Sequence, residues 1–195
     1  MAGLSSSFSL TRTEVVSSRA LRILLACGTL TLLMALGAVA RIPLPFTPVP
    51  FTMQTFFLFY GALALGRRSL FSLAAYLGIG ALGLPVFSGF ASGLAGIAGP
   101  TAGYLFGFLL CGFLVGSFIS RHSSPSMKKD AAILALGMLA YFIPGVLWLK
   151  AITGMKFHVA FMSGFFPFVP GDLVKVALAY ILYRQTRLRI HELLG

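Results

Sequence analysis

Six apolar stretches, separated by charged residues or by clusters of proline and glycine, make up most of this 195-residue chain. A helix needs about 20 apolar residues to cross a bilayer, and only helices or closed barrels satisfy their backbone polar groups there. The chain is 58% hydrophobic, whereas soluble domains are typically about 45 to 50% apolar. We therefore expect an all-α integral membrane protein with six transmembrane helices. The expected spans are residues 21–40, 51–65, 70–83, 101–120, 131–149 and 170–183.

The domain organisation follows from the same stretches. Residues 1–20 are polar and rich in serine, and we expect them to form a cytoplasmic tail. Residues 21–187 form the expected membrane domain, and residues 188–195 a second cytoplasmic tail. The second and third apolar stretches are short for a full crossing, which favours tilted helices, a locally thinner bilayer or loops that dip into the membrane.

The distribution of basic residues predicts the orientation, because cytoplasmic loops carry an excess of Lys and Arg. With the N-terminus inside, the inner segments hold eleven of the fifteen basic residues, and the outer loops hold only Arg41, Lys150 and Lys156. Lys175 lies within a span. Both termini are therefore expected in the cytoplasm. The formal net charge of +11 does not indicate nucleic-acid binding, since the basic residues lie between apolar segments and not on one soluble face.

An acid and a base lie within the last expected span. Pro170 suits the first turn of a helix, so Asp172 and Lys175, three residues apart, are expected to share one helix face. A charge in the hydrocarbon core costs between about 2.5 and more than 10 kcal/mol, so such residues usually pair or line a polar cavity. Two roles stay open: a ligand site, or a structural pair in which Asp172 complements the helix dipole and Lys175 is its counter-ion.

Four prolines occupy the connection between the first and second spans, residues 41–50, which we call the strap. Repeated proline fixes φ and removes backbone donors, so the strap is expected to be stiff and extended. It either covers an outward-facing pocket or acts as a rigid spacer. Thr47 and Gln54 favour a pocket, because a few polar groups among many aromatic residues are typical of small-molecule sites.

Glycine is frequent in the connection between the third and fourth spans, residues 83–104. Irregular backbone within a membrane is tolerated only where it is buried in protein or lines a cavity. The segment has no lysine followed by serine or threonine, so it is not a Walker-type phosphate loop. Gly99, Gly103 and Gly107 recur every four residues, a spacing typical of tightly packed membrane helices.

Several classes of membrane enzyme are excluded by the residues that they need. An intramembrane aspartyl protease uses two carboxylates, whereas Asp172 is the only acidic residue in an expected span. A rhomboid-like protease needs a Gly-x-Ser-Gly turn and a membrane histidine; the residues before Ser163 lack the first glycine, and all three histidines lie outside the spans. Cys27 and Cys111 lie in apolar runs and indicate neither a disulfide framework nor a metal cluster. We expect no enzyme activity, no metal and no cofactor.

Three marked stretches, in their order and spacing, carry a resemblance to a known family: the proline-rich residues 42–55, the glycine-rich residues 83–107 and residues 167–175 around the acid and the base. The chain resembles the BioY family, the biotin-binding S-components of energy-coupling factor (ECF) transporters. The resemblance covers about residues 21–187. It implies a six-helix S-component bundle in the bacterial cytoplasmic (inner) membrane that takes up biotin from the outer side.

The resemblance also implies which residues contact biotin. Asp172 and Lys175 stand where the family carries its Asp-x-x-Lys, so both are expected to contact biotin. Asp172 can accept from the ureido N–H groups, and Lys175 can donate to the ureido oxygen or to the distal carboxylate. Phe87, Phe90 and Tyr104 are candidates for the apolar wall around the thioether ring and the valeryl chain.

The implied partners are biotin and the lipid bilayer. A transmembrane coupling subunit with two ATPase subunits, transport without a dedicated coupling module, and homo-oligomerisation are all left open by the resemblance. S-components commonly pack an Ala-xxx-Ala stripe of the first helix against the coupling subunit, and this chain lacks that stripe. Cys27, Thr31 and Ala35 form the nearest substitute, with the right spacing. Two alternatives stay open: an S-component for another vitamin, and a structural membrane protein in which the charged pair only fixes helix register.

Overall fold

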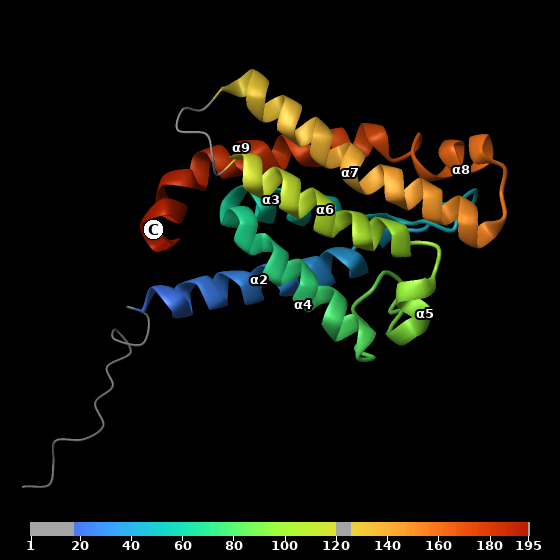
Figure 1. Ribbon diagram of the computed structural model, residues 1–195, viewed down its shortest axis with the longest axis horizontal. Helices are drawn as coiled ribbons and strands as arrows, with labels where there is room; N and C mark the ends of the chain where they lie inside the picture. The colour runs from blue at the N-terminus through green and yellow to red at the C-terminus, as the bar shows by residue number, and fades with distance from the viewer. Residues whose placement is uncertain (1–17, 120–125, 195) are drawn as a thin grey trace, which may run out of the picture.

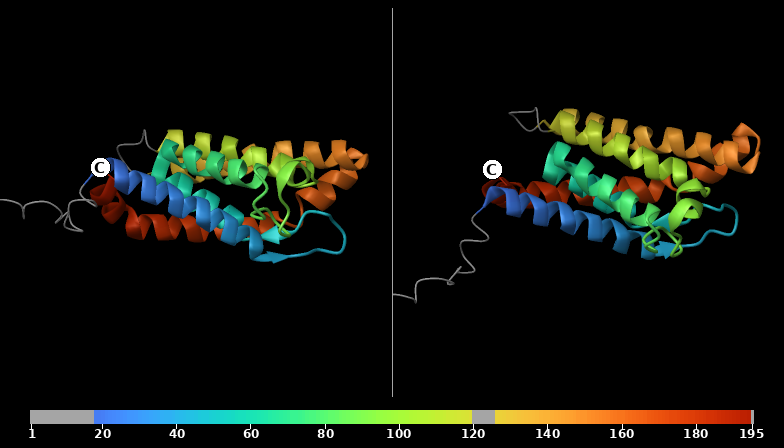
Figure 2. Two further views of the ribbon diagram at one scale, coloured as in Figure 1. Left: turned by 90° about the horizontal axis from the view of Figure 1, so that it is seen from below. Right: turned by 60° about the horizontal axis from the view of Figure 1, so that its bottom comes forward.

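The computed structural model describes residues 18–119 and 126–194. Within this part of the chain, six long helices run along the long axis of an elongated bundle (Figures 1 and 2). They are α2 (Arg19–Val39), α3 (Gln54–Leu65), α4 (Ser69–Ala81), α6 (Ala102–Ile119), α7 (Met127–Thr153) and α9 (Val169–Leu194). The smaller elements are the 3-10 helix η1 (Gly66–Arg68), the short helices α5 (Gly93–Ala98) and α8 (Phe157–Gly164), and the two-residue strands β1 (Arg41–Ile42) and β2 (Phe51–Thr52).

Most of each predicted stretch is helical, which confirms the all-α prediction. That all six cross a membrane stays a prediction. Among the described residues, three helices, α2, α6 and α7, are long and apolar enough to span. There are four if α8 and α9, which meet at 43°, count as one broken span. With 12 and 13 residues, α3 and α4 reach only about 18 to 20 Å at 1.5 Å per residue, short of a hydrocarbon core of about 30 Å.

The outer surface of the bundle is apolar. Large aliphatic side chains on α2, α7 and α9 are exposed, among them Leu24, Leu32, Leu147 and Leu178. Soluble monomers rarely expose contiguous apolar patches of more than a few hundred Å². Exposed leucines on several long helices are therefore the surface expected of a multi-pass membrane protein.

Two glycines allow α6 and α7 to pack closely. A Cβ at Gly103 would meet the Trp148 side chain and the Pro144 carbonyl, and a Cβ at Gly107 would meet the backbone of Tyr141. The predicted packing role of these two glycines is confirmed. Gly99 lies before α6, where its carbonyl accepts a hydrogen bond of 2.9 Å from the Trp148 indole.

The predicted docking stripe on α2 is wrong at two of its three residues, Cys27 and Thr31. Cys27 and Thr31 are buried inside the bundle, and the Thr31 hydroxyl donates to the Ser72 carbonyl of α4 at 3.0 Å. Because this small-residue face packs against α4, a separate subunit cannot reach it. The spacing identified residues on one face correctly, but not the element against which that face lies.

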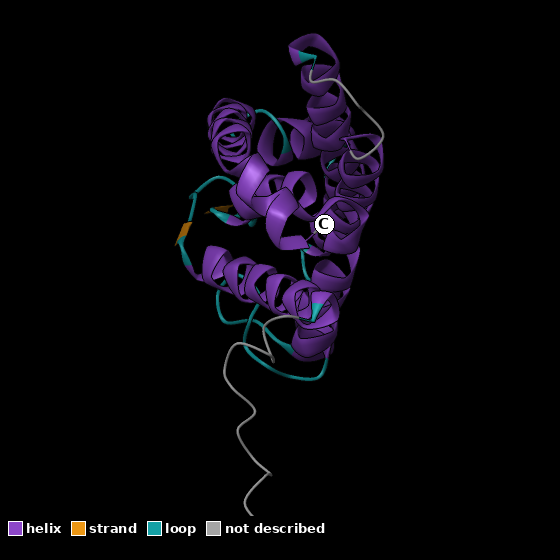
Figure 3. Ribbon diagram, turned by 90° about the vertical axis from the view of Figure 1, so that its left-hand side faces the viewer, coloured by secondary structure: helices purple, strands orange, loops and turns teal. Residues whose placement is uncertain are grey.

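The strap and the glycine-rich connection gather at one end of the bundle, which we call the strap end. The strap leaves α2 through β1 and returns through β2, which pairs with β1 in antiparallel register (Figure 3). Phe87 of the glycine-rich connection is buried against Tyr76 of α4, and the Tyr76 hydroxyl donates to the Val86 carbonyl at 3.0 Å. This irregular backbone is therefore partly buried in protein, as the sequence predicts. The start of α2 and the end of α9 lie at the opposite end (Figure 2).

Candidate ligand-binding site

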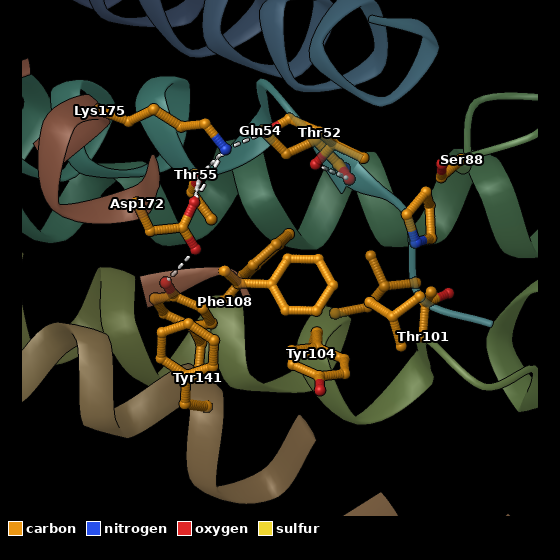
Figure 4. A pocket seen from close by; sticks show the side chains of 15 residues that line it. Thr52, Gln54, Thr55, Ser88, Thr101, Tyr104, Phe108, Tyr141, Asp172 and Lys175 are labelled. Carbon is orange, nitrogen blue, oxygen red and sulfur yellow. Dashed lines mark hydrogen bonds and ion pairs between the residues drawn. The ribbon is translucent and has the colours of Figure 1, made fainter. Parts of the chain in front are cut away.

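A cavity near the strap end separates α3 and α9 from α6 and α7. Its empty volume is about 530 Å³, part of it open to the surface. Charged and hydroxyl groups lie at one end of the cavity, and aromatic rings form its middle (Figure 4). The lining residues are Val49, Pro50, Thr52, Gln54, Thr55, Ser88, Thr101, Tyr104, Leu105, Phe108, Tyr141, Phe142, Phe168, Asp172 and Lys175.

Asp172 is held by donors from three helices. The residue lies in the first turn of α9 and is only 3% exposed. Its Oδ1 accepts from the Lys175 ammonium at 2.8 Å and from the Thr55 hydroxyl of α3 at 2.9 Å. Its Oδ2 accepts from the Tyr141 hydroxyl of α7 at 2.7 Å. A carboxylate offers about four acceptor positions, so one position remains for a further N–H or O–H donor.

Lys175 lies one turn further along α9 and is only 5% exposed. Its ammonium donates to the Thr52 carbonyl at 2.6 Å, as well as to Asp172, and more weakly to Thr55 at 3.3 Å. The ammonium also lies 3.4 Å from the centre of the Phe51 ring, within cation–π range. The charged pair thus joins α9 to α3 and β2, and it lines a cavity as well. The structural and the ligand-binding alternatives are both compatible with this geometry.

Gln54 and Tyr104 also line the cavity. The Gln54 amide donates to the Tyr76 hydroxyl at 2.8 Å, which leaves its second N–H for another acceptor. The Tyr104 hydroxyl donates to the Gly164 carbonyl of α8 at 2.7 Å. Because that hydroxyl is engaged with α8, Tyr104 presents its ring to the cavity and forms part of the apolar wall.

The other three residues singled out in the sequence do not line the cavity. The buried Thr47 hydroxyl accepts from the Val49 amide at 3.3 Å and so shapes the strap. Phe87 packs edge-to-face on Tyr76 with 5.5 Å between ring centres. Phe90 is 64% exposed and has a φ of 59°. The structure therefore brings together Asp172, Lys175, Gln54 and Tyr104.

Thr55 and Tyr141 are site residues that the sequence analysis missed. Both hydroxyls bond Asp172, although they lie 117 and 31 residues away from it in the chain. The available signal was a hydroxyl within an apolar stretch, since polar groups in membrane helices usually hydrogen-bond to a neighbouring helix. That signal does not specify the partner.

Within residues 18–119 and 126–194, no group of three or more His, Cys, Asp or Glu side chains could hold a metal ion. The cavity instead combines one open carboxylate position, one amide N–H and a wall of aromatic rings. Such a combination suits recognition of a small molecule with both polar and apolar parts.

The fold is similar to that of a solved S-component for biotin from an ECF-type ABC transporter. The TM-score is 0.79 and the sequence identity 25%, over 92% of this chain and 95% of that chain. The fold is therefore that of an S-component, a membrane subunit of an ECF-type transporter, which is a transport protein and not an enzyme.

The sequence pattern of the BioY family matches residues 9–192. The biotin transporter BioY of Thermotoga maritima is 36% identical over 168 residues, which cover 83% of this chain and 94% of that protein. The biotin transporter BioY of Rhizobium etli is 34% identical over 161 residues, 78% of this chain and 86% of that protein. The chain belongs to the BioY family.

Proposed function

We propose that this chain captures biotin from the outer side of a bacterial inner membrane and mediates its uptake. The observation that carries the proposal is the cavity in which a buried acid–base pair adjoins an aromatic wall. Biotin has two ureido N–H donors, a ureido carbonyl and an apolar bicyclic ring. These groups match an open carboxylate position, nearby N–H donors and the rings of Tyr104 and Phe108.

In the proposed complex, Asp172 accepts a hydrogen bond from a ureido N–H through its remaining acceptor position. Lys175 donates to the ureido oxygen in place of its long bond to Thr55, and the Gln54 amide supplies a further donor. Val49 and Pro50 of the strap line the cavity. In this proposal the strap covers the site on the outer side. A coupling subunit and two ATPases then drive release of biotin inside.

Equilibrium binding of radiolabelled biotin to the detergent-purified full-length chain tests the proposal. We expect saturable binding of one biotin per chain. Unlabelled vitamins then compete against the bound label. Displacement by another vitamin at a lower concentration than biotin itself would identify an S-component for that vitamin, and absence of saturable binding would contradict the proposal.

Tyr141→Phe is expected to weaken biotin binding by at least about tenfold, because hydrogen bonds to charged groups contribute about 1.5 to 3 kcal/mol. The variant removes the donor to Asp172 Oδ2 and leaves the ring that lines the cavity. Isothermal titration or radiolabel binding measures the change. Tyr183→Phe is a matched control, since Tyr183 lies further along α9 and does not line the cavity. Equal affinities of the Tyr141 variant and the control would remove Tyr141 from the site.

The coupling subunit is proposed to dock on an apolar groove at the end of the bundle opposite the strap end. The groove has an empty volume of about 900 Å³ and lies between α2, α3 and the last turns of α9. Thr29 and Ala26 of α2 line it, as do Gly61 and Ala64 of α3. Small residues allow helices to approach closely in membranes, where packing drives association. This groove replaces the buried Cys27 face as the candidate docking surface.

Thr29→Trp is expected to lower ATP-driven biotin uptake by at least about tenfold and to leave biotin affinity unchanged, because the indole fills a groove on which close packing depends. Uptake of labelled biotin is measured in proteoliposomes that hold the chain with its coupling subunit and ATPases. Val39→Trp, an exposed position near the strap end of α2, is the control. Normal uptake by the Thr29 variant would exclude the groove as the docking surface.

A further inference from the structure

The groove opposite the strap end contains a buried guanidinium nitrogen without a partner. Arg22 of α2 lines this groove together with residues of α3 and α9. Its Nε is buried and has no hydrogen-bond partner among the described residues. Its guanidinium also lacks a carboxylate there, since the ion pair in that part of the chain joins Lys175 to Asp172. Arginine stays ionised, and most buried polar atoms are hydrogen-bonded, so this N–H indicates an anionic acceptor from outside the chain.

The surroundings of Arg22 carry positive charge. Arg19 lies one turn earlier on α2, whose start lies at this end of the bundle (Figure 2). Arg68 of η1 donates to the Leu194 carbonyl of α9 at 3.3 Å, and Leu194 lines the groove. In the described part of the chain, the last turn of α9 adds one acid, Glu192, which is exposed and does not line the groove. Three arginines against one exposed acid leave a positive potential that favours an anion.

The rest of the groove is apolar. Aliphatic side chains form most of its walls, among them Leu25, Leu33, Leu65 and Ile190. Two further polar side chains line it, and both are already hydrogen-bonded. The Thr29 hydroxyl donates to the Leu25 carbonyl at 2.8 Å. The Tyr60 hydroxyl lies 3.3 Å from the hydroxyl of Thr186. The groove therefore combines an apolar wall with one unpaired cationic donor, which matches an amphiphile with an anionic head.

We propose that this groove binds an anionic phospholipid in the free chain, with the lipid phosphate on Arg22 and an acyl chain along the apolar wall. A guanidinium presents its donors in a planar fork that matches phosphate oxygens. Lipid tails are as apolar as leucine, so the acyl chain gains little by leaving the bilayer, and the headgroup provides the selectivity. Basic pockets between membrane helices recognise anionic headgroups in this way.

The same groove is the surface proposed above for the coupling subunit, and this second step rests on the proposed function. The lipid occupies the groove while the chain is free and leaves when the coupling subunit docks. The lipid thus shields the buried Arg22 nitrogen from hydrocarbon until a protein surface replaces it.

Native mass spectrometry of the purified full-length chain tests the lipid site. The detergent contains equal amounts of phosphatidylglycerol and phosphatidylcholine with identical acyl chains. The wild type is expected to retain at least about fivefold more phosphatidylglycerol, the factor that one arginine contributes near an anionic lipid. Arg22→Gln should lower this ratio to less than about twofold, because Arg19 is exposed to screening by salt and Arg68 is bonded to Leu194.

Two further variants separate the headgroup from the acyl chain. Arg67→Gln removes a neighbouring cation of η1 that is exposed and does not line the groove, and it should leave the ratio unchanged. Thr29→Trp fills the groove and keeps Arg22, so it should lower retention of both lipids equally. If Arg22→Gln lowers the thermal stability of the protein, Thr29→Trp decides.

The outcomes separate the lipid site from the proposed function. Equal retention of the two lipids by the wild type, or an unchanged ratio in the Arg22 variant, would overturn the lipid site. Biotin capture would stand, since no biotin enters the measurement. The complex with the coupling subunit and ATPases should retain less phosphatidylglycerol than the free chain. Equal retention on both would place the coupling subunit on another surface and leave the lipid site intact.

Discussion

Asp172→Asn is expected to weaken biotin binding by about 3 to 5 kcal/mol, a factor of more than a hundred, because it breaks a buried charged pair. The carboxylate accepts from Lys175, Thr55 and Tyr141 and keeps one position for the ligand. An amide has one acceptor oxygen and adds two donors where acceptors are required. It also leaves the Lys175 ammonium, only 5% exposed, without its counter-charge.

Lys175→Ala should produce a loss of the same size, since it leaves the Asp172 carboxylate buried without its cation. Radiolabel binding and thermal unfolding are measured together on each single variant in detergent. A folded single variant with wild-type affinity would refute the assignment of this pair to the ligand site.

The double variant Asp172→Leu with Lys175→Leu separates the ligand site from a structural pair. Replacing a buried ion pair by apolar residues is often neutral or stabilising by about 1 to 4 kcal/mol. If the pair only joins α9 to α3 and β2, the double variant should fold and transport normally. If the pair binds ligand, the double variant should fold and bind no biotin. Preserved uptake in the double variant would therefore favour the structural alternative.

The central pair could be predicted from the sequence because its geometry is local. Asp172 and Lys175 lie three residues apart after a proline that suits a helix start, so one helix fixes their separation. The helical stretches could also be predicted, because the length of each apolar run is a local property of the sequence. The last stretch was expected to end near Tyr183, but α9 continues to Leu194. Charged residues beyond a span mark the edge of the apolar stretch and do not end a helix.

The rest of the site depends on contacts between distant segments. Thr55, Tyr141 and Ser88 reach the cavity from α3, α7 and the glycine-rich connection, and no local spacing relates them. The wrong prediction for Cys27 and Thr31 has a related cause. In a membrane protein both the interior and the lipid-facing surface are apolar, so periodicity shows which residues share a face but not what that face contacts.

Gly107→Ala is expected to destabilise the protein by about 3 kcal/mol. This value is at the upper end of the range for adding a carbon atom to a packed core. A Cβ at this position would meet the backbone of Tyr141, which cannot move aside as a flexible side chain can. The two helices α6 and α7 must therefore separate. Because the Tyr141 hydroxyl donates to Asp172, the separation should also weaken biotin binding.

Gly78→Ala provides the matched control for this prediction. Gly78 lies within α4, and no atom stands within 4 Å of the Cβ that alanine would add. Alanine in place of an unconstrained helical glycine stabilises by about 0.5 to 1 kcal/mol, so this variant should unfold at or above the wild-type temperature and keep its biotin affinity. Thermal unfolding of both variants in one detergent, with and without biotin, measures the contrast. If Gly107→Ala also unfolds at the wild-type temperature, α6 and α7 do not pack as closely as described, and the position of Tyr141 beside Asp172 loses its support.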